Sequence, residues 1–494
     1  MKATVCRTLV VYLCLAGLPR MGHGEITVDS ISPKLSVAAS LRTRWELWNW
    51  FEPTGTQNND YDFIGAVGRA SVKWKDDPFE LFVEGQSSAL IDLPTTASAP
   101  APQGNLGLGG VYFQHNRRRN DASVFLKQGY LTLKQLGLPG LSIKGGRFEF
   151  SEGNEVLSGD ASVDWLKNTR LAQRLIGSFG WSDVGRAFDG GVVAFNRAPI
   201  NVTLMASHPT EGGFDLNGMH SIDDIDLGYA ALNFTKLRAS SSSDARLFYI
   251  YYDDRRHQTK SDNRPLAARN NATERSADIN LHTGGGHLIH VASTPFGSVD
   301  GMLWGVLQGG DWGRQSDFGW SWDVEAGWQP ALPWKPWIRA GYTRSSGDDN
   351  PNDDKHKTFF QILPTARIYS FSTFYNLMNT QDAFGSLLLR PITGLVSRTE
   401  LHVLRLTESH DLWYQGSGAT LSDRNRAEGF GFPGRPANGQ RELFTLVETS
   451  IGYDWNRFLN TNLYYGHAFG GAVVNKIYSG SDADFGYLEL TLKI

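Results

Sequence analysis

Cationic side chains recur at alternate positions in several segments, and this spacing places them on one face of an extended strand. A guanidinium donates two parallel hydrogen bonds to a carboxylate, so a row of arginines could bind an acidic sugar chain. The same arginines could instead form ion pairs with acidic side chains on their own face, such as Glu46, Glu84 and Glu325, and have only a structural role in the sheet. The sequence leaves both roles open. The candidate cations are Arg42, Arg44, Arg69, Lys73 and Arg339, with Arg186 as a further candidate.

A second cluster of chemically useful side chains lies in a loop of acidic and amide residues. Hard oxygen ligands are those that Ca²⁺ prefers, so we hypothesise a structural Ca²⁺ here and expect no other cofactor. The loop lacks the later Glu of the EF-hand pattern, and a solvated turn explains the same composition. The ligands in this hypothesis are Asp348, Asn350, Asn352 and Asp354.

Three histidines, His282, His287 and His290, flank the run Gly284-Gly285-Gly286. Imidazole nitrogens gathered in this way are candidate ligands for a transition metal. The glycines offer the alternative interpretation of an irregular strand, in which the histidines have no shared role.

The segments that carry these side chains alternate strictly between apolar and polar residues. In residues 35–51, Trp45 and Leu47 share one face and Arg44 and Glu46 share the other. The same alternation continues through residues 486–494. About eighteen such segments have the roughly 9–11 residues that a tilted membrane strand requires. We therefore predict an all-β fold: a single-chain transmembrane antiparallel β-barrel of about 18 strands, in which the last strand pairs with the first.

The connections between these segments alternate between short and long. Bacterial outer-membrane barrels have short periplasmic turns and long extracellular loops, so we expect both ends of the barrel segment to be periplasmic. Two of the long loops, residues 151–185 and 346–382, contain too many apolar side chains for a solvated loop. We predict that both fold into or over the lumen. The short turns include residues 76–78, 137–140, 197–199, 330–336 and 391–394, and the other long loops are residues 94–120, 253–276 and 409–440.

The N-terminal residues predict export from the cytoplasm. Residues 1–24 combine basic residues, an apolar run and small residues near a cleavage point, as in a secretory signal peptide. Residues 25–34 would then be a short periplasmic segment, and residues 35–494 the barrel. The chain of 494 residues has a formal charge of −4, and no later stretch reaches the ~18 consecutive apolar residues of a transmembrane helix. We predict the cell outer membrane as the location.

Several stretches resemble the alginate export family of outer-membrane porins, and the likeness runs in order over most of the predicted barrel. The match is closer to wider members of the family than to its dedicated alginate exporter. The resemblance therefore implies the fold of this chain but not the identity of the transported molecule. The resemblance implies a barrel of about eighteen strands whose Arg-rich lumen passes an anionic polysaccharide outward. The stretches are RTRWELW (42–48), LFVEGQSS (81–88), LKQGYLTL (126–133), LSIKGGRFEF (141–150), GRAFDGG (185–191) and RSSGDDNPNDDKHKTFFQILPTARIYSFSTFYNLMN (344–379).

The resemblance also implies particular pore residues. Arg147 matches the arginine after the glycine of the family's "GR" strand, Arg344 the arginine that opens the long loop, and Arg367 is a third candidate. By its own periodicity, Arg147 would point at lipid. A bulge at Gly145-Gly146 would turn it into the lumen instead.

The function we expect is a passive conduit for an alginate-like polyuronate or its oligomers, with a net positive ring at its narrowest point. The alternative within this class is a general or small-solute porin. An outer-membrane barrel enzyme is the alternative from another class, but the sequence has no nucleophile-elbow motif, so we expect no enzyme activity. The expected partners are an anionic polysaccharide, outer-membrane lipid and periplasmic export machinery, and no nucleic acid.

Overall fold

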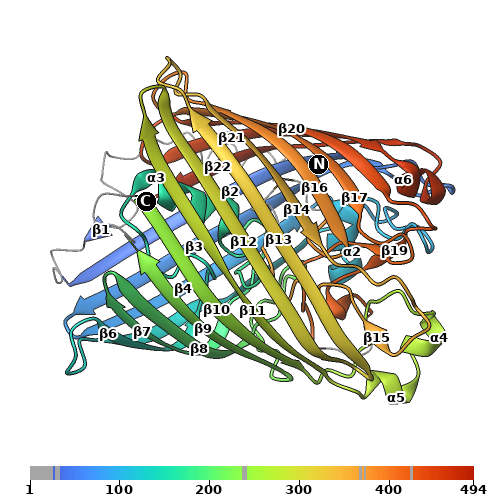
Figure 1. Cartoon of the computed structure of the whole chain (residues 1–494), viewed down its shortest axis with the longest axis horizontal. Helices are drawn as coiled ribbons and strands as arrows, with labels where there is room; N and C mark the ends of the chain where they lie inside the picture. Colours follow the sequence, from blue (N-terminus) through green and yellow to red (C-terminus); the bar gives the residue numbers. More distant parts are fainter. Residues whose placement is uncertain (1–25, 28–33, 236–241, 366–369, 372–373, 423–426) are drawn as a thin grey trace.

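The computed structural model describes residues 26–27, 34–235, 242–365, 370–371, 374–422 and 427–494, so the predicted signal peptide (residues 1–24) lies outside the described residues. Within them, eighteen long antiparallel strands form one sheet that closes into a barrel, as predicted (Figure 1). The strands are β2 (Leu35–Asn49), β3 (Asp60–Asp76), β4 (Phe79–Ile91), β5 (Asp121–Lys134), β6 (Leu141–Phe148), β7 (Phe188–Arg197), β8 (Ile200–Pro209), β9 (Ile225–Thr235), β10 (Ser242–Asp254), β11 (Ile279–Thr294), β12 (Gly297–Trp312), β13 (Gln315–Gln329), β14 (Trp337–Ser345), β16 (Thr380–Leu389), β17 (Leu395–Leu406), β20 (Glu442–Asp454), β21 (Leu459–Gly470) and β22 (Asp482–Lys493).

The seam of the barrel lies between β2 and β22. Trp45 lies opposite Leu488, and the backbone N–H groups of Ala39 and Ile494 each donate to the carbonyl oxygen of the other residue at 2.9 and 2.8 Å. Leu488 is exposed on the outside of the barrel, whereas its neighbour Tyr487 is buried inside. The predicted alternation of the last segment is therefore confirmed. Pairing the first long strand with the last leaves no open edge at the seam.

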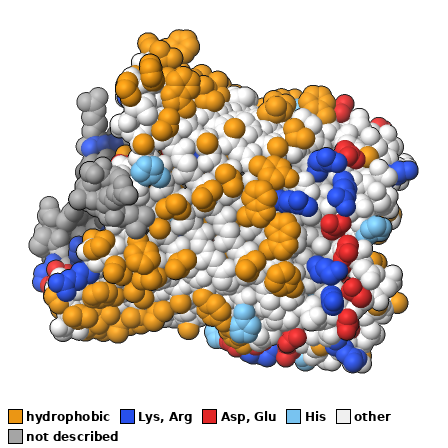
Figure 2. Space-filling view, viewed as in Figure 1, with side chains coloured by type: hydrophobic (Ala, Val, Ile, Leu, Met, Phe, Trp, Pro, Cys, Tyr) orange, Lys and Arg blue, Asp and Glu red, His pale blue; other side chains and the backbone are white. Residues whose placement is uncertain are grey.

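The outer face of the wall is apolar and the inner face is polar. On β13, Phe318 and Val324 are exposed outside, whereas Asp323 and Glu325 are buried inside. In Figure 2, hydrophobic and uncharged atoms cover the wall, and charged side chains gather toward one end. Burying apolar area is worth roughly 25 cal/mol per Å², so such a wall is stable only against lipid. Other outward apolar side chains include Trp45, Leu47, Leu303, Leu307, Trp322 and Trp328.

Short turns lie at one end of the barrel and long loops at the other (Figure 1). The predicted short turns at residues 76–78, 137–140, 197–199, 330–336 and 391–394 all fall at the short-turn end. One connection at the long-loop end was not expected to be short: residues 313–314 alone join β12 to β13. Gly313 has a φ of 63°, which a tight hairpin needs and which glycine adopts at little cost.

Two long loops fold into the barrel, as predicted, and we call them the first inserted loop (residues 149–187) and the second inserted loop (residues 346–379). Many of their described apolar side chains, among them Leu171, Phe179 and Phe359, are fully buried. None of the helices in the described part of the chain is long and apolar enough to cross a membrane. The short elements are β1 (Ile26–Thr27), α2 (Leu108–Asn116), α3 (Ala161–Leu166), η1 (Lys167–Leu171), α4 (Leu266–Arg269), α5 (Ala272–Arg275), β15 (Lys355–His356), β18 (Leu412–Tyr414), η2 (Ala427–Phe430), β19 (Gly434–Pro436) and α6 (Ala472–Ile477).

Candidate solute path through the barrel

Arg42 and Arg44 project inward from β2 and hold the tip of the first inserted loop. The Arg42 guanidinium donates to the carbonyl oxygens of Gly180 at 2.9 Å and Ser182 at 2.5 Å. The Arg44 guanidinium donates to the Glu489 carboxylate at 2.5 and 2.9 Å. A charge-assisted bond to a carboxylate is roughly twice as strong as a neutral one, so these contacts fix the loop and the seam together.

Arg69 lies on the next strand and faces water. Its guanidinium is 3.1 Å from Glu149 and 3.6 Å from Glu84, and Lys127 is 3.5 Å from Glu149. Between 12 and 25% of the Arg69, Glu84 and Glu149 side chains is exposed, although they point into the barrel. Water therefore enters the lumen along this side. We call the partly exposed inward set the hydrated wall; it comprises Arg42, Arg69, Glu80, Glu84, Lys134, Glu149 and Glu489.

The opposite side of the lumen is filled by the first inserted loop. Arg174 donates to Asp323 at 2.5 Å, and Arg170 and Arg339 approach Glu325 at 3.0 and 2.8 Å. At most 3% of each of these side chains is exposed. Removing one partner of a buried ion pair typically costs about 3–5 kcal/mol, so this side anchors the loop and leaves no room for a solute.

Arg186 is buried and makes none of its described contacts with a carboxylate. Its guanidinium donates to the carbonyl oxygens of Ser417 and Ala419 and lies 5.2 Å from the ring centre of Phe179. Burial lowers the pKa of the Arg186 guanidinium because the charged form is taken out of water. The residue ties the first inserted loop to residues 417–419, and its carbonyl oxygen accepts from Lys127, which also contacts Glu149 of the hydrated wall.

Arg147 is on the outer face of the barrel, so the predicted inward turn is wrong. The register of β6 runs without a shift on both sides, and Arg147 lies opposite Asp189 of β7. Its guanidinium approaches the Asp189 carboxylate at 2.6 Å and donates to the Met219 carbonyl oxygen at 2.7 Å. With no bulge at Gly145-Gly146, the strand keeps its period of two and Arg147 keeps the outward phase.

Arg344 is also on the outer face, and its predicted role in the pore is wrong. It lies opposite Trp322, which is exposed on the outside, and its guanidinium is 5.7 Å from the Trp320 ring centre. Directly opposed residues of an antiparallel pair share one face of the sheet. Arg367, the third residue taken from the family likeness, lies outside the described residues.

The four residues of the calcium hypothesis form consecutive turns. Asp348 accepts from the backbone N–H of Asn350 at 2.9 Å, and Asn350 accepts from that of Asn352 at 3.2 Å. Side-chain oxygens used in this way stabilise the turns themselves. Binding of Ca²⁺ by Asp348, Asn350, Asn352 and Asp354 stays a prediction.

The three histidines near Gly284-Gly285-Gly286 do not form one site. His282 and His290 point outward, toward Tyr249 and Ser243, whereas His287 points inward and lies 2.7 Å from Asp244. The strand is regular here, so alternate residues lie on opposite faces of the wall.

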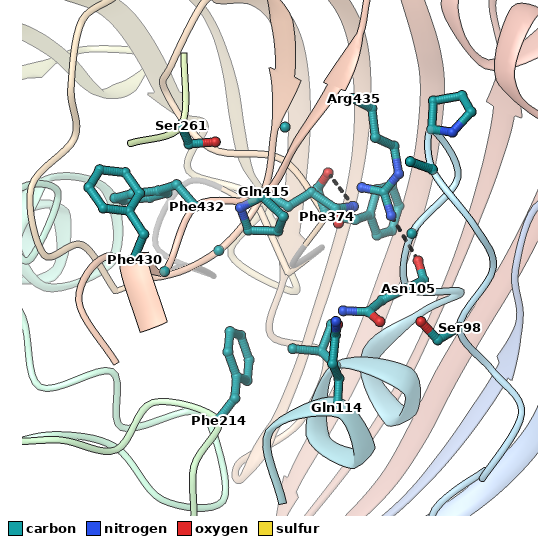
Figure 3. Close-up of a pocket in the computed structure, with 18 of the residues that line it drawn as sticks. Ser98, Asn105, Gln114, Phe214, Ser261, Phe374, Gln415, Phe430, Phe432 and Arg435 are labelled. Carbon is teal, nitrogen blue, oxygen red and sulfur yellow. Dashed lines mark hydrogen bonds between the residues drawn. The ribbon is translucent and has the colours of Figure 1, made fainter. Parts of the chain in front are cut away.

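A cavity of about 600 Å³ lies among the long loops at the outer end of the path (Figure 3). Arg435 is buried beside it and donates to the carbonyl oxygens of Gln103 and Asn105 at 2.7 and 2.8 Å. Its Nη1 has no hydrogen-bond partner within the described chain. Arg269 is the other charged residue of the described lining, which contains no carboxylate. The lining also has aromatic rings and amides, from Trp48, Trp50, Phe214, Phe374, Phe430, Phe432, Asn105, Gln114, Asn270 and Gln415.

The sequence predicted the phase of the inward arginines and named three acidic side chains that pair with them. Glu46 lies 3.4 Å from Arg44, Glu84 3.6 Å from Arg69 and Glu325 2.8 Å from Arg339. The described contacts of Arg42, Arg44, Arg69 and Arg339 are ion pairs and loop anchors, which is the structural role left open above. A direct role of these arginines in binding a solute stays a prediction. The cavity was missed because residues from six separate loops form it, and only the excess of aromatic side chains in those loops hinted at it.

A closed 18-stranded barrel with an apolar outside, a polar inside and inserted loops defines an outer-membrane porin. The sequence model of the alginate export family matches residues 34–479, and the chain belongs to this family. A search of curated proteins found no match.

Solved structures of outer-membrane channels share the fold. OccK11 (OpdR) of Pseudomonas aeruginosa is 10% identical, with 97% of this chain and 99% of that chain covered and a TM-score of 0.53. OpdK of Pseudomonas aeruginosa with vanillate is 9% identical, covering 93% and 98%, with a TM-score of 0.54. OccAB1 of Acinetobacter baumannii is 10% identical, covering 93% and 96%, with a TM-score of 0.54. At these identities the likeness concerns the fold alone.

Proposed function

We propose that the protein is a passive outer-membrane channel for short acidic carbohydrates, such as oligomers of a uronic acid. The observation that carries this proposal is the cavity among the long loops. It combines aromatic rings, on which sugar rings stack, with amides that suit hydroxyl groups. Its two arginines face no lining carboxylate, so the cavity favours an anion.

Beyond the cavity, the solute would move along the hydrated wall. Basic and acidic side chains alternate there and provide several weak sites in series, which permit release as well as entry. The loop-filled side of the lumen restricts the width of the path, which favours short oligomers over a bulky polymer. We propose that the long loops face the cell exterior and that the short turns face the periplasm.

A second candidate is the passage of a whole polyuronate chain in single file, which membership of the alginate export family favours. A polymer would cross through the same cavity and along the same wall, so only the dependence on chain length separates the two candidates. No catalytic step is part of either proposal.

Planar-bilayer recordings on the purified barrel test both candidates. We expect uronate oligomers of two to four units to block the current at concentrations at which neutral oligomers of equal length do not. Block that strengthens steadily to long chains would favour polymer passage. Equal block by acidic and neutral sugars would reject both and leave a general small-solute porin.

A further inference from the structure

Four buried polar side chains meet on the inner face of the barrel wall, and none of them belongs to the hydrated wall or to the described lining of the cavity. Glu400 and His402 share the inward face of β17, and Glu448 lies directly opposite Glu400 on β20. Asp382 reaches the same place from β16 on the other side of β17. At most 6% of each side chain is exposed. We call these four residues the wall cluster.

The histidine of the cluster has one nitrogen engaged and one unengaged. His402 Nδ1 lies 2.8 Å from Asp382 Oδ2, a hydrogen-bond distance. Nε2 lies 3.7 Å from Glu448 Oε1 and 3.9 Å from Glu400 Oε2, and it has no hydrogen-bond partner among the described residues. Distances of this length are too great for hydrogen bonds. A fully buried nitrogen therefore points into a gap between two carboxylates.

The gap has the size of a metal ion. One ligand atom from each of Glu400, His402 and Glu448 lies within 4.8 Å of the others. A divalent ion at about 2.0–2.2 Å from each ligand would need only a small inward movement of the carboxylates. The ligand set of one imidazole and two carboxylates suits a first-row transition ion, because Ca²⁺ and Mg²⁺ prefer oxygen ligands alone.

The surrounding contacts orient these ligands as in a metal site. With Nδ1–H donated to Asp382, the Nε2 lone pair points into the gap, an arrangement common to metal-binding histidines. Glu448 accepts from the Tyr464 hydroxyl and from the Phe371 backbone N–H, each at 2.9 Å. These contacts reach both oxygens of the Glu448 carboxylate, Phe371 at Oε1 and Tyr464 at Oε2, so the group is held in place.

The charges of the cluster also call for a cation. Three carboxylates meet there, and among the described ion pairs Arg398 contacts that of Glu400 alone. Arg170 is 3.8 Å from Glu400 but 3.0 Å from Glu325, so its charge is shared. A proton on His402 would supply one positive charge, but an imidazolium Nε2–H would be expected to form a short hydrogen bond to one of the carboxylates. We propose that Glu400, His402 and Glu448 bind a divalent transition-metal ion inside the barrel wall, with Zn²⁺ as the probe.

The test uses the full-length untagged chain, refolded from urea into detergent in the presence of Zn²⁺ and then desalted. We expect about one Zn²⁺ per folded chain by elemental mass spectrometry. His402→Gln and Glu448→Gln should each lower this at least tenfold. The matched control is His356→Gln: His356 is another buried histidine bound to an aspartate, Asp317 at 2.6 Å, and lies outside the cluster. The His356→Gln variant should bind as much Zn²⁺ as the wild type.

Wild-type protein with less than 0.1 Zn²⁺ per chain would overturn the proposal, as would full occupancy in His402→Gln. Should the His402 and Glu448 variants fail to fold, Co²⁺ in the wild type decides the question. Intense visible bands that Zn²⁺ abolishes would support the site, and the weak spectrum of aqueous Co²⁺ would show that a proton alone occupies it.

Discussion

Arg170 of the first inserted loop donates to Glu325 of β13 through its Nε at 3.0 Å, and both side chains are buried inside the barrel. Arg339 donates to the same carboxylate at 2.8 Å. Arg174 of the same loop also donates to Glu325, at 3.4 Å. One acidic side chain of the wall thus contacts one cation of the wall and two cations of the loop.

Glu325→Gln should loosen the first inserted loop, because it leaves three buried arginines, Arg170, Arg174 and Arg339, without their shared carboxylate. We expect a loss of about 3–5 kcal/mol in the free energy of unfolding, and noisier single-channel currents of higher mean conductance. The matched control is Glu442→Gln, which breaks an exposed pair with Arg405 on the outer rim and should leave the conductance unchanged. Equal conductance in wild type and Glu325→Gln would show that the loop is held by other contacts.

Arg69→Glu should shift ion selectivity toward cations. The substitution places a third carboxylate beside Glu84 and Glu149 in a partly hydrated lumen, where charges are screened less than in bulk water. The reversal potential in a salt gradient measures the shift, which should shrink as the salt concentration rises. Arg405→Glu on the outer rim is the control, and a shift of equal size there would contradict a path along the hydrated wall.

Arg435→Met should weaken block by acidic oligomers about tenfold while leaving block by neutral oligomers unchanged. The substitution keeps much of the side-chain volume but removes the one buried guanidinium among the described residues of the cavity lining. Arg441→Met is the control, since Arg441 pairs with Glu408 in an exposed position. Loss of block by acidic and neutral oligomers alike would point to a collapsed loop instead of a lost charge.

Asp348→Asn should stabilise the second inserted loop at neutral pH. Burial, with Asp411 and Asp353 nearby, raises the pKa of Asp348 to about 6. The folded protein therefore binds this proton more tightly than the unfolded chain, and the group destabilises the fold increasingly as the pH rises from about 4 to about 6. We expect Asn to raise stability by about 1–2 kcal/mol at pH 7.5 and to change little at pH 4. Urea unfolding at both pH values measures this, and an equal effect at both would exclude titration as the cause.

The strands could be predicted because alternation is a local property of the chain. Trp45 and Leu47 faced outward and Arg44 and Glu46 inward, as their spacing of two requires. Arg147 follows the same rule. Its spacing alone predicts an outward side chain, and the bulge that would have turned it inward does not form. Arg344 was placed from a motif, and a motif does not determine the face of a strand.

Contacts between different strands and between different loops could not be predicted in this way. Glu400 and His402 are two residues apart and visibly share a face, but Glu448 and Asp382 join them only through the register of three strands. The cavity depends likewise on loops that meet only in the folded barrel. The sequence indicated that two loops are buried, since their side chains are apolar, but not which wall each loop would contact.

The ion pair between Arg44 and Glu489 at the seam joins residues 445 positions apart. Contacts of such sequence separation form late, because the chain between them must be ordered before they repay their entropy. The edge of β2 that pairs with β22 therefore stays open until β22 is in place. An assembly intermediate with that edge open would be prone to pair with another chain, so the first strand depends on protection throughout insertion.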